Sequence, residues 1–260
     1  MLRGNSLVEL FTSQEIKLDS VEVLKYETFT SRTVDSEVVI LAWRGLPSPE
    51  SEKAEVLRYL VQNTSPSSII INLSSVAVYG QNPDINYETT VPKPINPYGQ
   101  SKLDLESYLD SFAATRVCNL RISNVFGDPG FIDVLNRILE GARNGVKVEL
   151  VSPTSVSRDF ISIDTFIEIL KQILFLSKAL QWREVINVSA GKSMTLHELL
   201  NLVEHLSNSK ISCLEVPLRD DVIKQSLISN LRIMELLNYK VSSQTLELQN
   251  YIRLQVNIAK

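Results

Sequence analysis

Tyr98 and Lys102 lie four residues apart in the segment INPYGQSKLDLE, residues 95–106, at the predicted start of a helix. Four helical residues advance about 6 Å and return nearly to the same face, so the ammonium of Lys102 can lie near the phenol of Tyr98. The pKa of an isolated tyrosine is about 10, and a nearby cation lowers it toward the working range of a general acid or base. The pair therefore predicts proton transfer to or from a substrate oxygen.

A third candidate, Ser75, follows the strongly apolar part of SIIINLSSVAVYG, residues 68–80. Parallel sheets bind ligands at the carboxyl ends of their strands. If the helix near Tyr98 packs beside this strand, the three side chains converge on one crevice, and Ser75 can hydrogen-bond the same substrate oxygen. The spacing alone leaves another interpretation open, in which Tyr98 is simply a residue of the first helical turn after Pro97 and Lys102 is solvated.

The elements that position these residues alternate between two types. Apolar segments at 37–43, 68–80 and 115–123 alternate with segments of helical period at 49–63 and 98–113. Continuously apolar strands indicate burial on both faces of a sheet. We therefore predict an α/β fold with a Rossmann-type, doubly wound parallel sheet.

The pattern changes beyond residue 127. Short strands are expected in VKVELVS and RDFISID, then a helix begun by Asp164, and a later helix opened by a capping box from Thr195 to Glu198. The tail from 229 to 258 predicts two helices separated near 239–243. We predict a Rossmann-type core over 1–127, to which 159–190 return, and a mainly substrate-binding lobe over 128–260.

The composition limits the classes of function. The 260 residues are 44% hydrophobic, and 26 basic and 30 acidic residues give a net charge of -4 with no charged run. Neither nucleic acid nor a membrane surface is therefore an expected partner. Two cysteines without metal-ligand spacing fit a reducing compartment, and the start of the chain lacks the apolar segment of a signal peptide, so we expect a cytoplasmic protein without a metal site.

The segment NPYGQSK, with NLSSVAVYG before it and LRISNVFG after it, resembles the signature of the extended short-chain dehydrogenase/reductase family. This family includes nucleotide-sugar epimerases, dehydratases and 4-ketoreductases. The resemblance continues through RDFISID, INVSAGKSMTLHELL and PLRDDVIKQSLISNLRIMELLNY, and runs from about residue 37 to 240.

The resemblance implies NAD or NADP as cofactor, a nucleotide-diphosphate sugar as substrate and a homodimer. It assigns Tyr98 as general acid/base, Lys102 as its activator and ribose ligand, and Ser75 as the hydroxyl that positions the substrate oxygen. The other residues that it places at the cofactor are Leu41, Ala42, Trp43, Ser74 and Ile122. Those that it places at the substrate, besides Ser75, are Asn124, Arg158 and Arg219.

For the two arginines, another interpretation stays open. A guanidinium suits a diphosphate, but Arg158 could instead pair with Asp159, and Arg219 with Asp220 or Asp221.

One family motif is absent. The family opens with a strand and a G-x-x-G-x-x-G turn that lets a pyrophosphate approach a helix N-terminus, but none of the nine glycines forms this turn. Instead, residues 3–20 resemble the family's second strand and the loop after it. Loss of the central first strand would leave neighbouring strands with unpaired backbone. Either the chain is a piece of a longer protein, or other residues fill the gap, or the fold has given up the cofactor.

The residues after Ser75 narrow the reaction. The family's dehydratases carry an Asp-Glu pair there, whereas this chain has Val76 and Ala77, which disfavours dehydration. A 4-ketoreductase or an epimerase remains, in which Tyr98 moves the hydroxyl proton while the nicotinamide carries hydride. The alternative is a non-catalytic or truncated relative of the family that does not bind the dinucleotide. The sequence leaves open the sugar, its base, and NAD versus NADP.

The family dimerises through two helices, here about 98–113 and 49–63. Leu103, Leu105 and Leu109 could serve that interface or the core.

Overall fold

The structure is a computed structural model of the chain. It describes residues 21–23, 38–43, 45–65, 67–112, 116–128, 133–176, 180, 183–238 and 244–257. Residues 3–20, which were compared above with the family's second strand, lie outside the described part of the chain.

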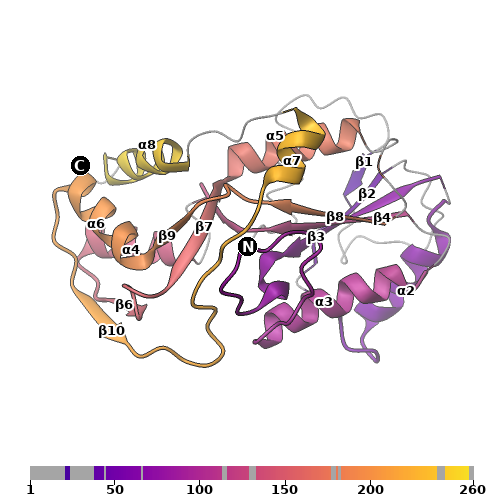
Figure 1. Cartoon of the computed structure of the whole chain (residues 1–260), viewed down its shortest axis with the longest axis horizontal. Coiled ribbons are helices and arrows are strands. Elements are labelled where there is room, and N and C mark those ends of the chain that lie inside the picture. Colours follow the sequence, from indigo (N-terminus) through magenta and orange to yellow (C-terminus); the bar gives the residue numbers. More distant parts are fainter. Residues whose placement is uncertain are drawn as a thin grey trace.

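Among the described residues, five parallel strands form the main sheet, in the order β1 (Val21–Val23), β2 (Val38–Leu41), β3 (Ile69–Ser75), β4 (Arg116–Ile122) and β8 (Arg183–Val188) (Figure 1). The predicted parallel α/β fold is confirmed. Strand β1 pairs with β2, with Val21 opposite Val38. Loss of a central strand would have left one backbone edge of β2 unpaired. In this chain, β1 pairs with that edge.

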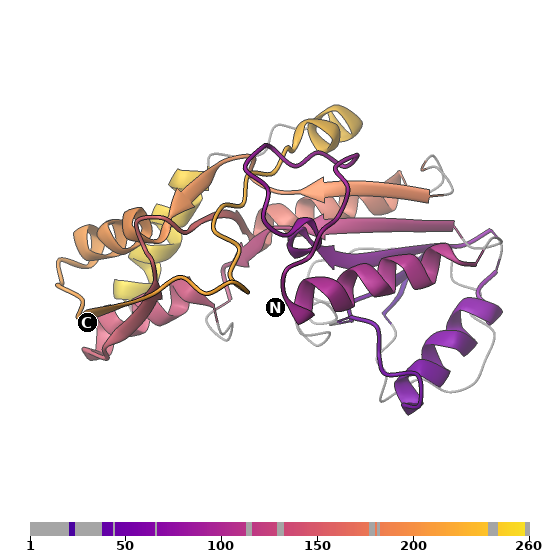
Figure 2. The same cartoon turned by 60° about the horizontal axis from the view of Figure 1, so that its bottom comes forward.

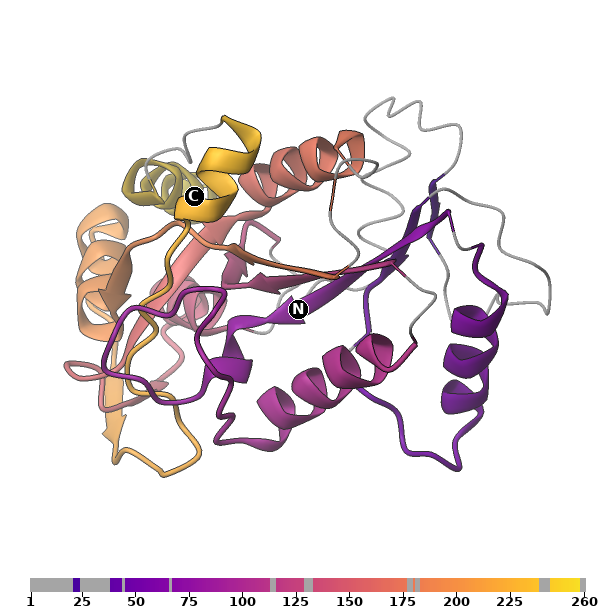
Figure 3. The ribbon, with the colours of Figure 1, turned by 45° about the vertical axis from the view of Figure 1, so that its right-hand side comes forward.

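Helices cover both faces of this sheet (Figure 3). Side chains of a strand alternate between its faces, so Val39 and Leu41 join one core cluster and Val38 and Ile40 join another. The first cluster contains side chains of α2 (Glu52–Asn63) and α3 (Pro97–Asp110). The second contains side chains of α5 (Ile163–Phe175) and α7 (Leu231–Leu237).

A further group of elements lies to one side of the main sheet (Figure 2). One small sheet combines β5 (Asn124–Phe126), β7 (Ser157–Ser162) and β9 (Ser193–Thr195), and another combines β6 (Val148–Val151) and β10 (Cys213–Val216). Helices α4 (Val134–Asn144), α6 (Leu196–Ser207) and α8 (Gln244–Asn257) contribute to a separate core cluster. The domain bounds given above stay a prediction.

Local capping signals account for several helix starts. Thr195 and Glu198 form the predicted capping box of α6. The prediction that Asp164 begins α5 is wrong by one residue, because the hydroxyl of Ser162 accepts a hydrogen bond from the backbone N–H of Thr165 at 3.1 Å and the helix begins at Ile163.

Two of the three leucines predicted for either a dimer interface or the core lie in the core. Leu105 and Leu109 are fully buried, and Leu103 is partly buried against another cluster. The dimer itself stays a prediction. Within the described ranges, no helix has the length and apolar character needed to cross a membrane.

Candidate active site

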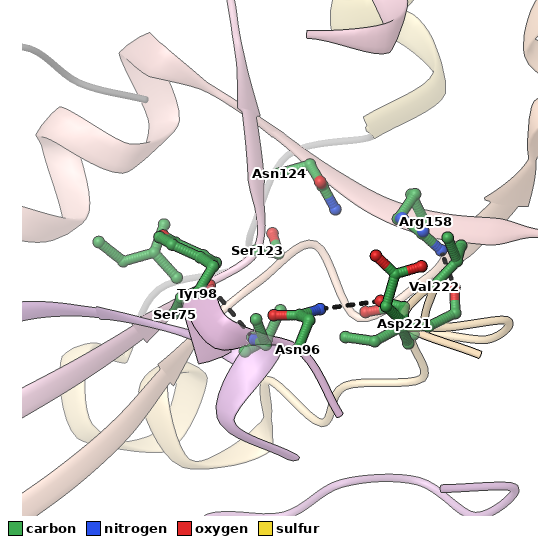
Figure 4. A pocket seen from close by; sticks show the side chains of 13 residues that line it. Ser75, Asn96, Tyr98, Ser123, Asn124, Arg158, Asp221 and Val222 are labelled. Atoms are coloured by element: carbon green, nitrogen blue, oxygen red, sulfur yellow. Dashed lines mark hydrogen bonds between the residues drawn. The ribbon is translucent and has the colours of Figure 1, made fainter. Parts of the chain in front are cut away.

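A cavity of about 270 Å³ lies at the carboxyl ends of β3 and β4. Its lining residues come from the end of β3, the short 3₁₀ helix η2 (Val76–Tyr79), the start of α3, the segment after β4, strand β7 and the loop 221–226. Five of the residues predicted from the sequence line it: Ser75, Tyr98, Ile122, Asn124 and Arg158. Figure 4 shows Ser75 and Tyr98 on one side of the cavity and Arg158 on the other.

Tyr98 reaches the cavity because of how α3 begins. The side chain of Asn96 caps the helix by accepting a hydrogen bond from the N–H of Gly99 at 2.8 Å, and Pro97 is the first helical residue. A Cβ atom on Gly99 would lie 2.5 Å from the carbonyl oxygen of Ala77 in η2. Glycine at this position therefore lets α3 abut the segment that follows Ser75.

The hydroxyl oxygen of Ser75 also has a local role. It accepts a hydrogen bond from the backbone N–H of Ala77 at 3.2 Å and caps η2. This bond fixes the chain where it leaves β3, so the Ser75 side chain stays at the cavity wall near the start of α3.

Lys102 is buried, with 4% of its surface exposed, so the interpretation that leaves it solvated is wrong. Its Nζ donates to the carbonyl oxygen of Leu73 at 2.6 Å and to that of Trp43. Burial lowers the pKa of Lys102 to about 8, and the charge of Glu106 opposes this effect. Lys102 lies one helical turn from Tyr98 but is not among the residues that line the cavity in the described part of the chain.

Two predicted substrate residues are held by backbone contacts. Asn124 donates from Nδ2 to the carbonyl oxygen of Asp159 at 2.9 Å. Arg158 donates from Nη1 to the carbonyl oxygens of Ser157 at 2.7 Å and Ile223 at 2.6 Å, and burial lowers its pKa to about 10. Arg158 is therefore fixed at the wall of the cavity, where a guanidinium can meet a diphosphate.

The sequence left open an ion pair between Arg158 and Asp159. In the structure, the carboxylate of Asp159 instead accepts hydrogen bonds from backbone N–H groups. Its two oxygens accept from Ala190 at 2.9 Å and Lys192 at 3.0 Å. Asp159 is fully buried, and burial raises its pKa to about 6.

Arg219 behaves differently from Arg158. It is exposed, and its Nε lies 3.1 Å from Oδ1 of Asp221. Within the described ranges it does not line the cavity. The surface ion pair that the sequence left open is thus present, and the contact of Arg219 with a substrate stays a prediction.

Other lining residues were not identified from the sequence, among them Asn96, Ser123 and residues 221–223. Asn96 donates from Nδ2 to the carbonyl oxygen of Asp221 at 3.2 Å and so joins opposite walls of the cavity (Figure 4). An asparagine before a proline at a helix start is a capping signal that could have drawn attention to Asn96. Nothing local in the sequence identifies its partner 125 residues away.

The residues predicted for the cofactor do not form a complete dinucleotide site in the part of the chain that the structure describes. Leu41 is a core residue and Ala42 packs against the core. Ser74 is buried, and its hydroxyl donates a hydrogen bond to Glu106. The carbonyl of Trp43 accepts from Lys102. The sequence also lacks a glycine-rich turn, and residues 24–37, which connect β1 to β2, contain no glycine. The described residues therefore include no pyrophosphate cradle of the Rossmann type.

Comparison with known proteins gives matches over most of the chain. A profile of the NAD dependent epimerase/dehydratase family matches residues 53–189. The dTDP-4-dehydro-6-deoxyglucose reductase of Escherichia coli is 29% identical over 150 residues, which are 55% of this chain and 46% of that protein. The chain thus spans about half the length of this relative.

Solved structures are similar over a larger share of the chain. The UDP-N-acetylglucosamine 4-epimerase of Methanobrevibacter ruminantium M1, in complex with UDP-N-acetylmuramic acid, has a TM-score of 0.67 and 25% identity, with 86% of this chain and 76% of that chain covered. The UDP-glucuronic acid 4-epimerase of Bacillus cereus, in complex with UDP-glucuronic acid and NAD, has a TM-score of 0.73 at 17% identity, with 91% and 80% covered. The second similarity concerns the fold alone.

Proposed function

The chain belongs to the NAD dependent epimerase/dehydratase family, and from this premise we propose that it binds a nucleotide-diphosphate sugar in the cavity and exchanges a proton with it through Tyr98. The observation that carries the proposal is the shared cavity of Ser75, Tyr98, Asn124 and Arg158. Two hydroxyl groups at one wall suit a sugar oxygen, and the arginine at the other suits a diphosphate.

In this proposal the reaction is that of a 4-ketoreductase or an epimerase. The phenol of Tyr98 donates its proton to a sugar carbonyl oxygen during reduction, or accepts one from a sugar hydroxyl during oxidation. The hydroxyl of Ser75 hydrogen-bonds the same oxygen and holds it near the phenol. Val76 and Ala77 follow Ser75 without the acid pair of a dehydratase, which argues against water elimination.

The family's hydride carrier is a nicotinamide dinucleotide, NAD or NADP. Because the described residues form no pyrophosphate cradle, we assign to this chain only substrate binding and proton transfer, and derive no hydride step.

One observation favours the alternative, a non-catalytic relative that binds the sugar nucleotide alone. The Nζ of Lys102, the predicted ribose ligand, already donates hydrogen bonds to two backbone carbonyl oxygens.

Two titrations of the purified chain test the proposal and separate it from the alternative. Calorimetry with UDP-glucose, dTDP-glucose and GDP-mannose should detect micromolar binding of at least one. Replacing the guanidinium with Arg158→Met should weaken that binding at least about tenfold, because a charged hydrogen bond contributes about 1.5–3 kcal/mol. Absence of binding of all three probes would refute the proposal.

The second titration uses NADH and NADPH, followed by their fluorescence. Micromolar binding would support the enzyme, whereas no binding up to millimolar would favour the non-catalytic relative. Arg219→Met tests the other predicted arginine in the same calorimetric titration. Unchanged nucleotide-sugar binding in this variant would remove Arg219 from the predicted substrate site.

A further inference from the structure

A buried ion pair joins α3 to the sheet next to the cavity. The carboxylate of Glu106 accepts three hydrogen bonds from Arg121. Nε donates to Oε1 at 3.2 Å and to Oε2 at 3.3 Å, and Nη2 donates to Oε2 at 2.7 Å. Glu106 is 3% exposed and Arg121 is 5% exposed. The hydroxyl of Ser74 also donates to Oε1 of Glu106. One side chain of α3 thus binds both strands whose carboxyl ends form the cavity.

The contacts lie next to the predicted catalytic residues in the chain. Ser74 directly precedes Ser75, and Arg121 directly precedes Ile122, which also lines the cavity. On α3, Tyr98, Lys102 and Glu106 follow one another at intervals of four residues and so lie close to one helix face.

Arg121 extends the network to two further elements. Its guanidinium lies 4.8 Å from the centre of the Tyr79 ring in η2. The hydroxyl of Tyr79 donates to Oδ1 of Asn187 in β8 at 2.7 Å, and the backbone N–H of Asn187 donates to Glu88 at 3.0 Å. Helix α3, strands β3, β4 and β8, and η2 are thereby held in one relative position.

Stability alone is a poor explanation for this pair. Taking two charges out of water is costly, and apolar residues of similar volume in place of a buried pair often preserve or raise stability. The pair instead fixes the direction and distance of α3 relative to β4, because an arginine that binds a carboxylate through two nitrogens holds it in one geometry. The charge of Glu106 also opposes the effect of burial on the pKa of Lys102, which favours the ammonium form.

We propose that Glu106, bound by Arg121 and Ser74, is a positioning residue that sets α3 against the sheet so that Tyr98 faces the cavity and Lys102 beside it stays charged. The inference rests on the proposed acid/base role of Tyr98. Glu106 acts on Tyr98 through the helix and through Lys102, with no contact to the substrate.

The test compares fold and phenol ionisation in a variant that removes both charges. Glu106→Met combined with Arg121→Met should keep the thermal midpoint of the wild type or raise it. The ionisation of Tyr98 is followed by NMR of ¹³C-labelled tyrosine, with its resonance assigned from Tyr98→Phe. In the wild type its midpoint should lie well below 10, in the range up to about pH 8 where Lys102 still carries its charge, and in the double variant it should move back toward 10.

Two further variants keep the test decisive. Ser74→Ala removes a single hydroxyl and should shift the midpoint in the same direction by less, which covers the case of a misfolded double variant. Asp110→Asn is the matched control, because Asp110 lies on the same helix and its Oδ1 is 3.9 Å from Arg183 in a half-exposed ion pair. It should leave the midpoint of Tyr98 unchanged.

The outcomes separate this inference from the proposed function. A wild-type midpoint near 10 would refute the acid/base role of Tyr98 whatever Glu106 does. A lowered wild-type midpoint that stays the same in Ser74→Ala and in a folded double variant would overturn the positioning role of Glu106 and leave the proposed function standing.

Discussion

Lys102→Met should change the pH dependence of stability by a predictable amount. Burial lowers the pKa of Lys102 from its ordinary value of 10.5 to about 8 in the folded chain. One pKa unit corresponds to about 1.4 kcal/mol, so keeping this ammonium buried at pH 7 costs about 3 kcal/mol. Methionine has a similar length and no charge, so the variant loses this cost together with the two hydrogen bonds to carbonyl oxygens.

The sign of this pH dependence follows from the number of protons that the folded and unfolded chains bind. Below pH 8 both the folded and the unfolded chain hold the proton on Lys102, and the full cost is present. Between pH 8 and 10.5 the folded chain has lost a proton that the unfolded chain still binds, so the free energy of unfolding rises with pH. By pH 10 the cost has fallen to about 1 kcal/mol. The wild type should therefore gain about 2 kcal/mol over Lys102→Met between pH 7 and pH 10.

The assay is urea unfolding of both proteins at several pH values between 7 and 10. Taking the difference between wild type and variant cancels the titration of groups that the two share. Lys147→Met, which removes an exposed lysine, controls for the loss of one charge and should show no such gain. A difference between wild type and Lys102→Met that is constant across this pH range would refute the buried ammonium, and with it the geometry of the Tyr98 and Lys102 pair.

Three further predictions concern single residues. In assays that supply NADH or NADPH, Tyr98→Phe should lower the turnover of the nucleotide sugar about 10²- to 10⁴-fold with little change in KM, and a loss below tenfold would contradict the acid/base role. Asp159→Asn should lower the free energy of unfolding at pH 7 by about 1–3 kcal/mol, since an amide cannot accept both N–H groups of the 190–192 turn; urea denaturation at pH 7 measures the loss. Gly99→Ala should cost about 1–3 kcal/mol in the same measurement, because its Cβ would meet the carbonyl of Ala77; an unchanged value would mean that α3 does not approach η2 so closely.

The main elements of the fold could be predicted from local patterns. The apolar segments at 37–43, 68–80 and 115–123 contain β2, β3 and β4. The helical period at 49–63 contains α2, and that at 98–113 contains all of α3 except its first residue, Pro97. A strand buried on both faces needs apolar side chains at every position, which makes it visible in the sequence. Helix caps are equally local, although α5 begins at Ile163 after the cap Ser162, one residue before the predicted start at Asp164.

The candidate site was predictable only where the signal lies within a few residues. The spacing of Tyr98 and Lys102 and the position of Ser75 after a strand needed no tertiary information. Tertiary structure was needed, however, to tell which of the two predicted arginines lines the cavity. Arg158 is held there by the carbonyl of Ile223, 65 residues away, whereas Arg219 turns to Asp221 on the surface.

By itself, the sequence determined the parallel sheet, the helix that carries Tyr98, and the absence of a glycine-rich turn. Only the tertiary structure decided that β1 covers the edge of β2, that Lys102 points to the carbonyls of Trp43 and Leu73, and that Glu106 binds two strands at once. The reason is that a local pattern depends on neighbours within one helical turn or one strand. A buried charge, in contrast, takes the partners that the packing of distant segments places within reach.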